Sequence, residues 1–396
     1  MICGALAKGE SEVVYPLSSE DTEACLEVLG RIGVQSRRRK DSWQVRGGDF
    51  RQPDADLFCA DSAATLRFMT AVCSLVPGDC RLISGASLAA RPVGALVRAL
   101  RQVGVDCSMS QGETAPVVVK GGALMGGLAE LPGDVSSQFV SALLLIGPLA
   151  EQGLRIRLSS PLQSRPYVLM TTGCLREFGI SVGTSADLDE FQVSRQDYRA
   201  TRYVVEGDWS SASYLLALGA LCGEVEVENL DAGSVQADRA MVQMLRDMGA
   251  AVAVKGRSVA VRRSVLKAVR EDLSDCPDLL PTMGVLAAAA RGVSEFTGIA
   301  RARIKESNRV AALRDGLERM DIEVGEERDK LTIAGGEPIG AAIDSWNDHR
   351  IAMAFGVLGS ATEKTVISNA GCVSKSFPQF WDVVNSVGGK VRIDGK

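Results

Sequence analysis

The chain has 396 residues, of which 46% are hydrophobic and 23% are charged, and its formal net charge is −5. This composition is ordinary for a globular protein, the length is too great for a single hydrophobic core, and the acidic balance does not favour nucleic acid or a membrane surface as a partner. His349 is the only histidine, which excludes a multi-histidine metal site.

The ten cysteines are scattered without a C-x-x-C pair, so the sequence does not predict a zinc ribbon or a dithiol redox site. Most of them are expected to be small buried residues in a reducing compartment. The longest apolar stretch, residues 139–150, is too short to span a bilayer, and the chain does not open with a secretory signal. The expected location is therefore the cytoplasm.

The first elements in chain order are a short apolar helix, a turn at Gly9 and a strand, all within "MICGALAKGESEV". A second helix ends at "LGRIGVQ", residues 29–35, where Gly33 precedes another strand. The first helix is shorter than its counterparts later in the chain, and no strand precedes it. We interpret this as a truncated first copy of a repeat; the alternative is a divergent first copy, because terminal repeats are often atypical.

The helix–turn–strand pattern at Gly33 recurs five more times, at intervals of 71, 75, 70, 72 and 67 residues. A residue with positive φ is expected after each helix, which explains why glycine is favoured there. The later copies lie at residues 100–106, 175–181, 245–251, 317–323 and 384–390. Their turn residues are Gly104, Gly179, Gly249, Asp321 and Gly388.

A second kind of helix, apolar nearly all round, begins each later copy and is expected to be buried. These helices and the strands after them are predicted within residues 62–82, 136–156, 210–227, 278–296 and 347–366. Six such units predict an α/β fold of two domains with three repeats each, in which helices lie inside the sheets. We expect domains at 1–203 and 204–396, with a ligand cleft between them.

Polar side chains are concentrated where the buried helices begin, and a helix N-terminus suits an anion. Ser136, Ser137 and Gln138 stand at one such start, where ordinary capping is the alternative interpretation. Arg67 lies about one turn into another buried helix, where an arginine needs an anionic partner. Asp348, His349 and Arg350 begin a third, and for His349 alone a structural role is the simpler interpretation.

The segment "RARIKESNRVAALRDGL" gives the strongest local signal. As a continuous helix it would place Lys305, Glu306 and Arg309 on one face, with Ile304, Leu313 and Leu317 directed into the core. One carboxylate between two cations is either a surface salt-bridge ladder or an acid/base group within an anion site. Asp278, Lys375, Arg91, Ser164, Arg165 and Tyr167 add further candidates, so the sequence predicts a cationic site for a small substrate with several negative charges.

Taken together, the motifs resemble the EPSP synthase (3-phosphoshikimate 1-carboxyvinyltransferase) family, and most closely its archaeal and other prokaryotic members. The resemblance rests on "ADSAATLRF", "ARPVGAL", "SSQFVSALL", "SRPYVLMT", "VEGDWSSASY", "QADRA", "DCPDLLPT", "RIKESNRVAAL", "NDHRIAMA" and "VSKSFPQFW", in this order. It implies transfer of the enolpyruvyl group of phosphoenolpyruvate to the 5-hydroxyl of shikimate 3-phosphate, with neither a metal nor an organic cofactor, in a monomer. Both substrates are small molecules of aromatic amino acid biosynthesis.

The resemblance also implies roles for individual residues. Asp278 would accept the 5-hydroxyl proton, and Glu306 would donate a proton to the methylene carbon and later remove one. Ala63 would line the phosphoenolpyruvate pocket at a position where many members carry glycine, and its Cβ would restrict the longer inhibitor glyphosate. Shikimate 3-phosphate would contact Ser136, Ser137, Gln138, Ser164, Tyr167, Asp278 and Lys305, and phosphoenolpyruvate would contact Ala63, Arg91, Gln138, Arg309, Arg350 and Lys375.

Two alternatives remain open at the level of sequence. The family begins with a strand and a Lys-Ser-x-x-x-Arg segment that would end just before Met1, so the chain could bind shikimate 3-phosphate and turn over poorly. A UDP-N-acetylglucosamine enolpyruvyl transferase shares the fold, but it uses a cysteine in the loop before the second unit's Arg-Pro, where this chain has Ala90.

Overall fold

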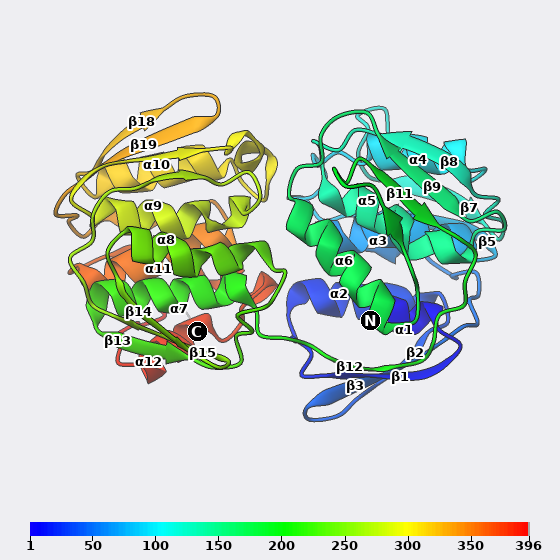
Figure 1. Cartoon of the computed structure of the whole chain (residues 1–396), viewed down its shortest axis with the longest axis horizontal. Coiled ribbons are helices and arrows are strands. Elements are labelled where there is room, and N and C mark those ends of the chain that lie inside the picture. The colour runs from blue at the N-terminus through cyan, green and yellow to red at the C-terminus, as the bar shows by residue number, and fades with distance from the viewer. Residues whose placement is uncertain (395–396) are drawn as a thin grey trace. The chain divides into compact units, whose positions relative to one another are not determined.

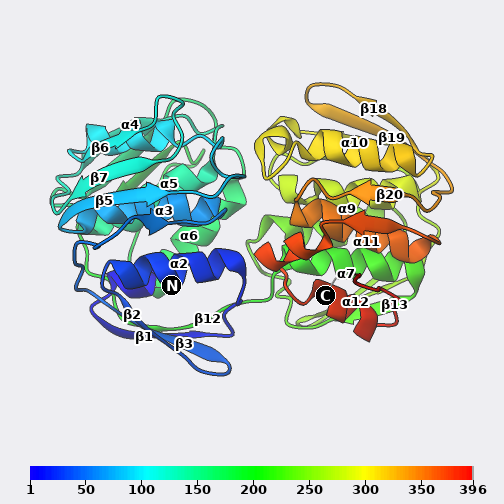
Figure 2. The same ribbon diagram turned by 180° about the vertical axis from the view of Figure 1, so that it is seen from behind.

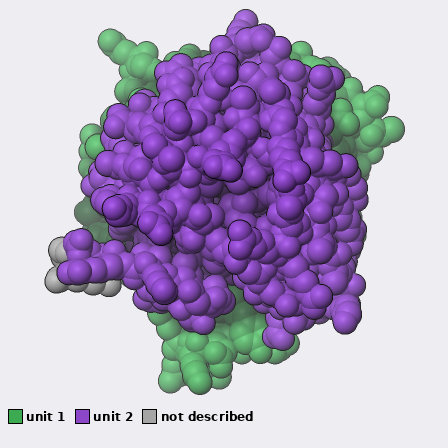
Figure 3. Space-filling view, turned by 90° about the vertical axis from the view of Figure 1, so that its left-hand side faces the viewer, with its two compact units in different colours: residues 1–205 green, residues 206–396 purple. Residues whose placement is uncertain are grey.

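The chain divides into two compact units, Met1–Val205 and Glu206–Lys396, and the computed structural model describes residues 1–394. Both combine buried helices with outer sheets, as the repeats predicted (Figure 1). Figure 3 shows the first unit in green and the second in purple. The boundary between the compact units follows Val205, and the assignment of domains to 1–203 and 204–396 stays a prediction.

The first unit contains twelve strands in three four-stranded sheets. The strands are β1 (Gly9–Val14), β2 (Gln35–Arg38), β3 (Ser42–Gly47), β4 (Leu57–Phe58), β5 (Gly78–Ile83), β6 (Asp106–Met109), β7 (Val117–Gly121), β8 (Gly127–Leu131), β9 (Leu154–Leu158), β10 (Gly183–Thr184), β11 (Glu190–Val193) and β12 (Arg202–Val204). The sheet orders are β12-β1-β3-β2, β4-β5-β7-β6 and β10-β11-β9-β8. Each sheet therefore repeats one plan, a parallel pair followed by two antiparallel partners.

Helices line the inner side of these sheets. They are α1 (Ile2–Leu6), α2 (Glu20–Arg31), α3 (Ala63–Val72), α4 (Gly94–Gln102), α5 (Ser137–Ile146) and α6 (Arg165–Glu177), with short 3-10 turns η1 (Cys73–Leu75) and η2 (Gly147–Leu149). The helices α3 and α5 pack on each other and are buried along nearly their whole length, as predicted. Strand β9 shows the complementary pattern, because Leu154, Ile156 and Leu158 are buried while the residues between them are exposed.

The second unit has sheets of order β13-β15-β14, β16-β17-β19-β18 and β20-β21. Its strands are β13 (Glu224–Val227), β14 (Ala251–Lys255), β15 (Ser258–Arg262), β16 (Arg270–Asp272), β17 (Gly292–Thr297), β18 (Glu323–Glu326), β19 (Lys330–Gly335), β20 (Ala342–Asp344) and β21 (Val366–Ser368). The helices and 3-10 turns are α7 (Trp209–Cys222), η3 (Ala237–Ala240), α8 (Met241–Asp247), η4 (Pro277–Leu279), α9 (Leu280–Ala288), η5 (Ala300–Ile304), α10 (Arg309–Arg319), α11 (His349–Ala361), η6 (Ala370–Lys375) and α12 (Phe380–Ser386).

Three helices form the centre of this unit, where α11 packs against both α7 and α9 (Figure 2). All nine residues of α9 are buried. A helix buried on every side cannot carry a charge along its length without cost, so charged side chains are confined to its ends. This packing brings the polar starts of the helices together.

The predicted helix ends are confirmed at all six copies of the repeat. The turn residues have positive φ, from 64° at Asp321 to 102° at Gly33. The strand predicted after Gly388 is wrong for the part of the chain that the structure describes, because residues 389–394 form neither helix nor strand. The tail "GGKVRI" has only two β-branched residues, Val391 and Ile393, among glycines and charged residues, so its preference for a strand is weak.

Seven of the ten cysteines are buried, as expected: Cys3, Cys25, Cys59, Cys73, Cys80, Cys107 and Cys276. Within residues 1–394, no helix combines the length and the apolar character needed to cross a bilayer.

Candidate active site

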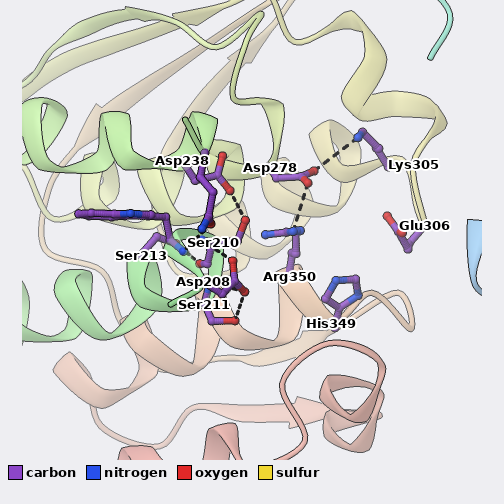
Figure 4. A network of polar contacts seen from close by, with 12 residues as sticks. Asp208, Ser210, Ser211, Ser213, Asp238, Asp278, Lys305, Glu306, His349 and Arg350 are labelled. Atoms are coloured by element: carbon purple, nitrogen blue, oxygen red, sulfur yellow. Dashed lines mark hydrogen bonds and ion pairs between the residues drawn. The ribbon is translucent and has the colours of Figure 1, made fainter. Parts of the chain in front are cut away.

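The starts of the central helices in the second unit bring together two carboxylates and four cations. Asp278 lies in η4 just before α9, Glu306 lies between η5 and α10, and Arg350 is the second residue of α11. Lys375 ends η6, which packs against α11. Figure 4 shows Asp278 directed toward both Lys305 and Arg350, with Glu306 close by. Residues almost a hundred positions apart thus share one site.

Asp278 contacts three of the cations. Its Oδ1 lies 2.7 Å from Nη1 of Arg309 and 3.5 Å from Nζ of Lys305, and its Oδ2 lies 3.1 Å from Nη2 of Arg350. Burial alone would raise the pKa of Asp278, but the charges of Arg350, Lys305 and Arg309 outweigh burial and hold its pKa well below the usual range. The carboxyl group is therefore ionised at neutral pH.

Glu306 is held between two cations. Its Oε2 lies 2.5 Å from Nη2 of Arg309, and its Oε1 lies 3.6 Å from Nζ of Lys375. Both carboxylates expose only 14% of their side chains. An anionic substrate entering this site would compete with Asp278 and Glu306 for the same cations.

Arg309 connects the cluster to the protein core. Its side chain is 1% exposed and contacts Asp278, Glu306 and Asp348, with Nε 2.8 Å from Oδ2 of Asp348. Burial would lower the pKa of Arg309, but Asp348, Glu306 and Asp278 raise it, so the guanidinium stays charged. Asp348 also caps α11 by accepting a hydrogen bond from N–H of Arg350. This cap fixes where the helix begins and therefore where Arg350 stands.

His349 is buried at 4% exposure next to this cap. Burial lowers the pKa of His349 to about 4, against the opposing charge of Asp348, so the ring is neutral at pH 7. Its Nδ1 lies 3.8 Å from Oδ1 of Asp348, beyond hydrogen-bond distance.

The prediction of a continuous helix through Lys305 and Glu306 is wrong. The turn η5 ends at Ile304 and α10 begins only at Arg309, so Lys305 and Glu306 lie in a non-helical segment. Ile304 is 54% exposed rather than in the core, whereas Leu313 and Leu317 are buried as expected. The physical reason is Asn308, whose side chain accepts a hydrogen bond from N–H of Ala311 and caps the helix at that point.

In the first unit, Arg67 joins the starts of α3 and α5. Its Nη1 donates to Oε1 of Gln138 at 2.7 Å and to Oγ of Ser136 at 3.2 Å, and its Nη2 donates to the carbonyl of Pro92 at 3.2 Å. Arg67 is 5% exposed, so these contacts pair a buried charge with polar groups. Arg91, the residue before Pro92, is buried at 9% exposure.

Ser136 is an N-cap, as the capping interpretation expected, because its Oγ accepts from N–H of Gln138 at 3.3 Å. Ser164 precedes α6 in a left-handed conformation, with φ 54° and ψ 46°, and is 3% exposed. The helices α5 and α6 are joined by Ser141 and Thr171, whose hydroxyls lie 2.7 Å apart. Ser137 is the first residue of α5, Ala63 is the first residue of α3, and Tyr167 lies in the first turn of α6.

One buried acid was missed by reasoning from sequence. Asp238 in η3 is 2% exposed and accepts a hydrogen bond from Oγ of Ser210 (Figure 4). Burial first, and the charge of Asp278 second, raise the pKa of Asp238 to about 6. The motif "QADRA" contains Asp238, but its sequence gives no local sign that the carboxyl group is buried near Asp278.

The cluster in the second unit does not have the chemistry of a metal site, because each carboxylate already faces cations. Across residues 1–394, His, Cys, Asp and Glu side chains form no group of three or more suited to hold a metal ion.

Comparison with known proteins identifies the relatives of this chain. The family model described as EPSP synthase (3-phosphoshikimate 1-carboxyvinyltransferase) matches residues 1–384. A protein of Dehalococcoides mccartyi named 3-phosphoshikimate 1-carboxyvinyltransferase is 47% identical over 396 residues, covering 100% of this chain and 94% of the relative. A protein of the same name from Methanopyrus kandleri is 40% identical and covers 98% and 92%.

Solved structures agree with the fold. The EPSP synthase of Acinetobacter baumannii superposes with a TM-score of 0.83 and 26% identity, covering 100% of this chain and 93% of that one. The enolpyruvyl transferase NikO of Streptomyces tendae has a TM-score of 0.76 at 17% identity, a likeness in fold alone.

Proposed function

Since this chain belongs to the EPSP synthase family, we propose that it transfers the enolpyruvyl group of phosphoenolpyruvate to the 5-hydroxyl of shikimate 3-phosphate and releases inorganic phosphate. The observation that carries the proposal is the pair Asp278 and Glu306, held side by side by Arg309 among four cations. Two positioned carboxylates suit a reaction in which one proton leaves an oxygen and another joins a carbon.

Shikimate 3-phosphate is assigned first to groups in the first unit. The N–H groups and hydroxyls at the starts of α5 and α6 can donate hydrogen bonds to a phosphate in the way helix N-termini do, through Ser136, Ser137 and Ser164. Gln138 and Tyr167 from the same helices, together with Lys305, would contact the rest of the substrate. Arg67 supports this assignment because it fixes Gln138 and Ser136 in place.

Phosphoenolpyruvate is assigned to Arg91, Arg309, Arg350 and Lys375, with Gln138 and Ala63 beside it. Its carboxylate and phosphate would replace the contacts that Asp278 and Glu306 now make with these cations. Losing cationic neighbours would let the pKa of Asp278 rise from its depressed value, which makes the carboxylate a better base. Substrate binding and activation of the base are thereby coupled.

The reaction would proceed by addition and then elimination. In the addition, Asp278 accepts the proton of the 5-hydroxyl, the oxygen bonds to C2 of phosphoenolpyruvate, and Glu306 donates a proton to C3. In the elimination, Glu306 removes a proton from C3, the double bond re-forms, and the C2–O bond to phosphate breaks. Glu306 has to enter the addition in its protonated form, and the proton that it removes from C3 restores that form. The 5-hydroxyl proton held by Asp278 passes to the departing phosphate, so Asp278 is ionised again and the atoms balance.

A chain that binds shikimate 3-phosphate without turnover is the alternative within the family. It predicts binding heat without phosphate release, whereas the proposed enzyme gives both. A UDP-N-acetylglucosamine transferase predicts phosphate release only when that sugar nucleotide replaces shikimate 3-phosphate. Ala90 before Arg91 argues against it, because that enzyme needs a cysteine in this loop.

The decisive experiment incubates the purified chain with phosphoenolpyruvate and shikimate 3-phosphate and measures inorganic phosphate together with the mass of the product. Phosphate release that needs both substrates, with a product heavier by one enolpyruvyl group, supports the proposal. If phosphate is released neither with shikimate 3-phosphate nor with the sugar nucleotide as the acceptor, the proposal is rejected. We further propose a cytoplasmic monomer of two domains, 1–203 and 204–396, with small molecules as its partners and neither metal nor organic cofactor.

A further inference from the structure

The segment that carries Lys305 and Glu306 belongs to no helix or strand, although its side chains need defined positions. A non-helical segment holds its side chains in place only if other groups fix its ends. Two arginines flank it: Arg303 in η5 and Arg314 in the second turn of α10. Both contact the same carboxylate.

That carboxylate is Glu326, the last residue of β18. One oxygen, Oε1, accepts from Nη1 of Arg303, and the other, Oε2, accepts from Nη1 of Arg314. Glu326 exposes 17% of its side chain and Arg303 exposes 22%. One half-buried carboxylate therefore connects the turn η5 before the segment to the helix α10 after it.

Arg303 also fixes the turn between β18 and β19. Its Nε donates to the carbonyl of Arg328 at 3.1 Å, and its Nη2 donates to the carbonyl of Glu327 at 2.6 Å. The start of η5 is held by the same turn, since N–H of Ala300 donates to Oδ1 of Asp329 at 2.7 Å. Arg303 thus uses three different nitrogens of its planar guanidinium for Glu326, Glu327 and Arg328, a fixed spread of donors that the single nitrogen of a lysine does not reproduce.

We propose that Glu326 is a positioning residue for the enolpyruvyl transfer, acting through Arg303 and Arg314 to hold the segment from Lys305 to Asn308. This inference rests on the proposed function of Lys305 and Glu306. Glu326 itself touches neither carboxylate of the site by any contact described above. Its effect on turnover passes through the position of Glu306.

The test compares Glu326→Gln with Glu323→Gln, a matched change at an exposed carboxylate on the same strand. We expect Glu326→Gln to lower kcat about 10- to 100-fold, because small displacements of reacting groups have effects of this size. The KM for phosphoenolpyruvate should change less than kcat, and Glu323→Gln should behave as the unmodified chain.

A double variant distinguishes positioning from a general structural defect. If Glu326 acts through Glu306, then Glu306→Gln and Glu306→Gln with Glu326→Gln should have equal kcat, because the two losses are not additive. Losses that multiply, or a Glu326→Gln variant with unmodified kcat, would overturn the inference.

Hydrogen–deuterium exchange gives a readout that does not need activity. The peptide covering residues 300–312 should exchange faster in Glu326→Gln than in Glu323→Gln. If the exchange of this peptide is unchanged, the inference is overturned, whether or not the chain is active. If the unmodified chain is inactive and the peptide still exchanges faster in Glu326→Gln, only the proposed function is refuted. If Glu326→Gln does not fold, Arg303→Lys replaces it with the same expected exchange, and failure of both to fold would show a folding role and overturn positioning.

Discussion

At the scale of single residues, Arg309 sets the electrostatics of the candidate site. It is buried at 1% exposure and reaches three carboxylates that come from before α9, before α10 and before α11. A buried charge is tolerated only when it is paired on several sides. Arg309 therefore both stabilises the meeting of these helix starts and keeps Asp278 and Glu306 together.

Replacing either carboxylate should reduce turnover far more than binding. We expect Asp278→Asn and Glu306→Gln each to lower kcat by roughly 10²- to 10⁴-fold, the usual contribution of a general acid or base. Dissociation constants for shikimate 3-phosphate, measured by calorimetry, should change much less. A loss below about tenfold in both variants would remove these residues from proton transfer.

Asp238 should make stability depend on pH. Its pKa is raised from 3.8 to about 6, so in this window the folded state binds more protons than the unfolded state and stability falls as pH rises. Asp238→Asn removes this contribution. The free energy of unfolding of the variant, measured with urea, should rise by about 2 kcal/mol relative to that of the unmodified chain between pH 4 and pH 6.

His349 provides a control of opposite sign. Its pKa is lowered from 6.5 to about 4, so the unfolded state binds more protons in this window and stability falls as pH decreases. The free energy of unfolding of His349→Gln should therefore rise relative to that of the unmodified chain as the pH falls toward 4. The prediction for Asp238 fails if the two variants show the same trend with pH.

Ala63 is expected to affect inhibition by glyphosate. It is 6% exposed at the first position of α3. If Ala63 lines the proposed phosphoenolpyruvate pocket, its Cβ would reduce the space available to an inhibitor longer than phosphoenolpyruvate. Ala63→Gly should lower the inhibition constant for glyphosate, compared at equal saturation with phosphoenolpyruvate. Equal constants for the two forms would show that Ala63 does not restrict the pocket.

At the scale of elements, two glycines in helices have different surroundings. A Cβ on Gly316 of α10 would lie 2.2 Å from Cζ of Phe355 in α11, whereas a Cβ on Gly30 of α2 would meet nothing within 4 Å. The close approach at Gly316 lets α10 and α11 pack, and this packing brings Arg309 to Asp348.

The two glycines should therefore respond oppositely to alanine. Gly30→Ala should stabilise the protein by about 0.5–1 kcal/mol through helix propensity. Gly316→Ala should destabilise it by about 1–3 kcal/mol, because overpacking exceeds the gain in propensity. Thermal unfolding checks both, and stabilisation by Gly316→Ala would mean that Phe355 can move aside without cost.

At the scale of the whole molecule, residues assigned to shikimate 3-phosphate come from both compact units. Ser137 belongs to the first unit and Lys305 to the second. Ser137→Ala and Lys305→Met should each weaken binding of shikimate 3-phosphate in calorimetry by about tenfold, the loss of one charge-assisted hydrogen bond. Addition of a chelator should leave the unmodified affinity unchanged. If only one of the two variants binds more weakly, the substrate contacts are confined to one unit.

The sequence by itself determined the repeats, the helix ends and the chemical character of the site. Six helices end at a residue with positive φ, as at Gly33 and Asp321, and this was predictable because backbone preferences act within a few residues. The caps at Ser136 and Asp348 were predictable for the same reason. The family motifs identified the candidate residues because their order is specific.

Only the tertiary structure decided which side chains meet. Arg309 joins Asp278 and Asp348, which are 31 and 39 positions away. Glu326 accepts hydrogen bonds from Arg303 and Arg314, which are 23 and 12 positions away. The break in the helix before Arg309 and the buried state of Asp238 were equally hidden. Such features depend on how buried helices pack and on which charges then share a low-dielectric space, and neither is encoded in local spacing.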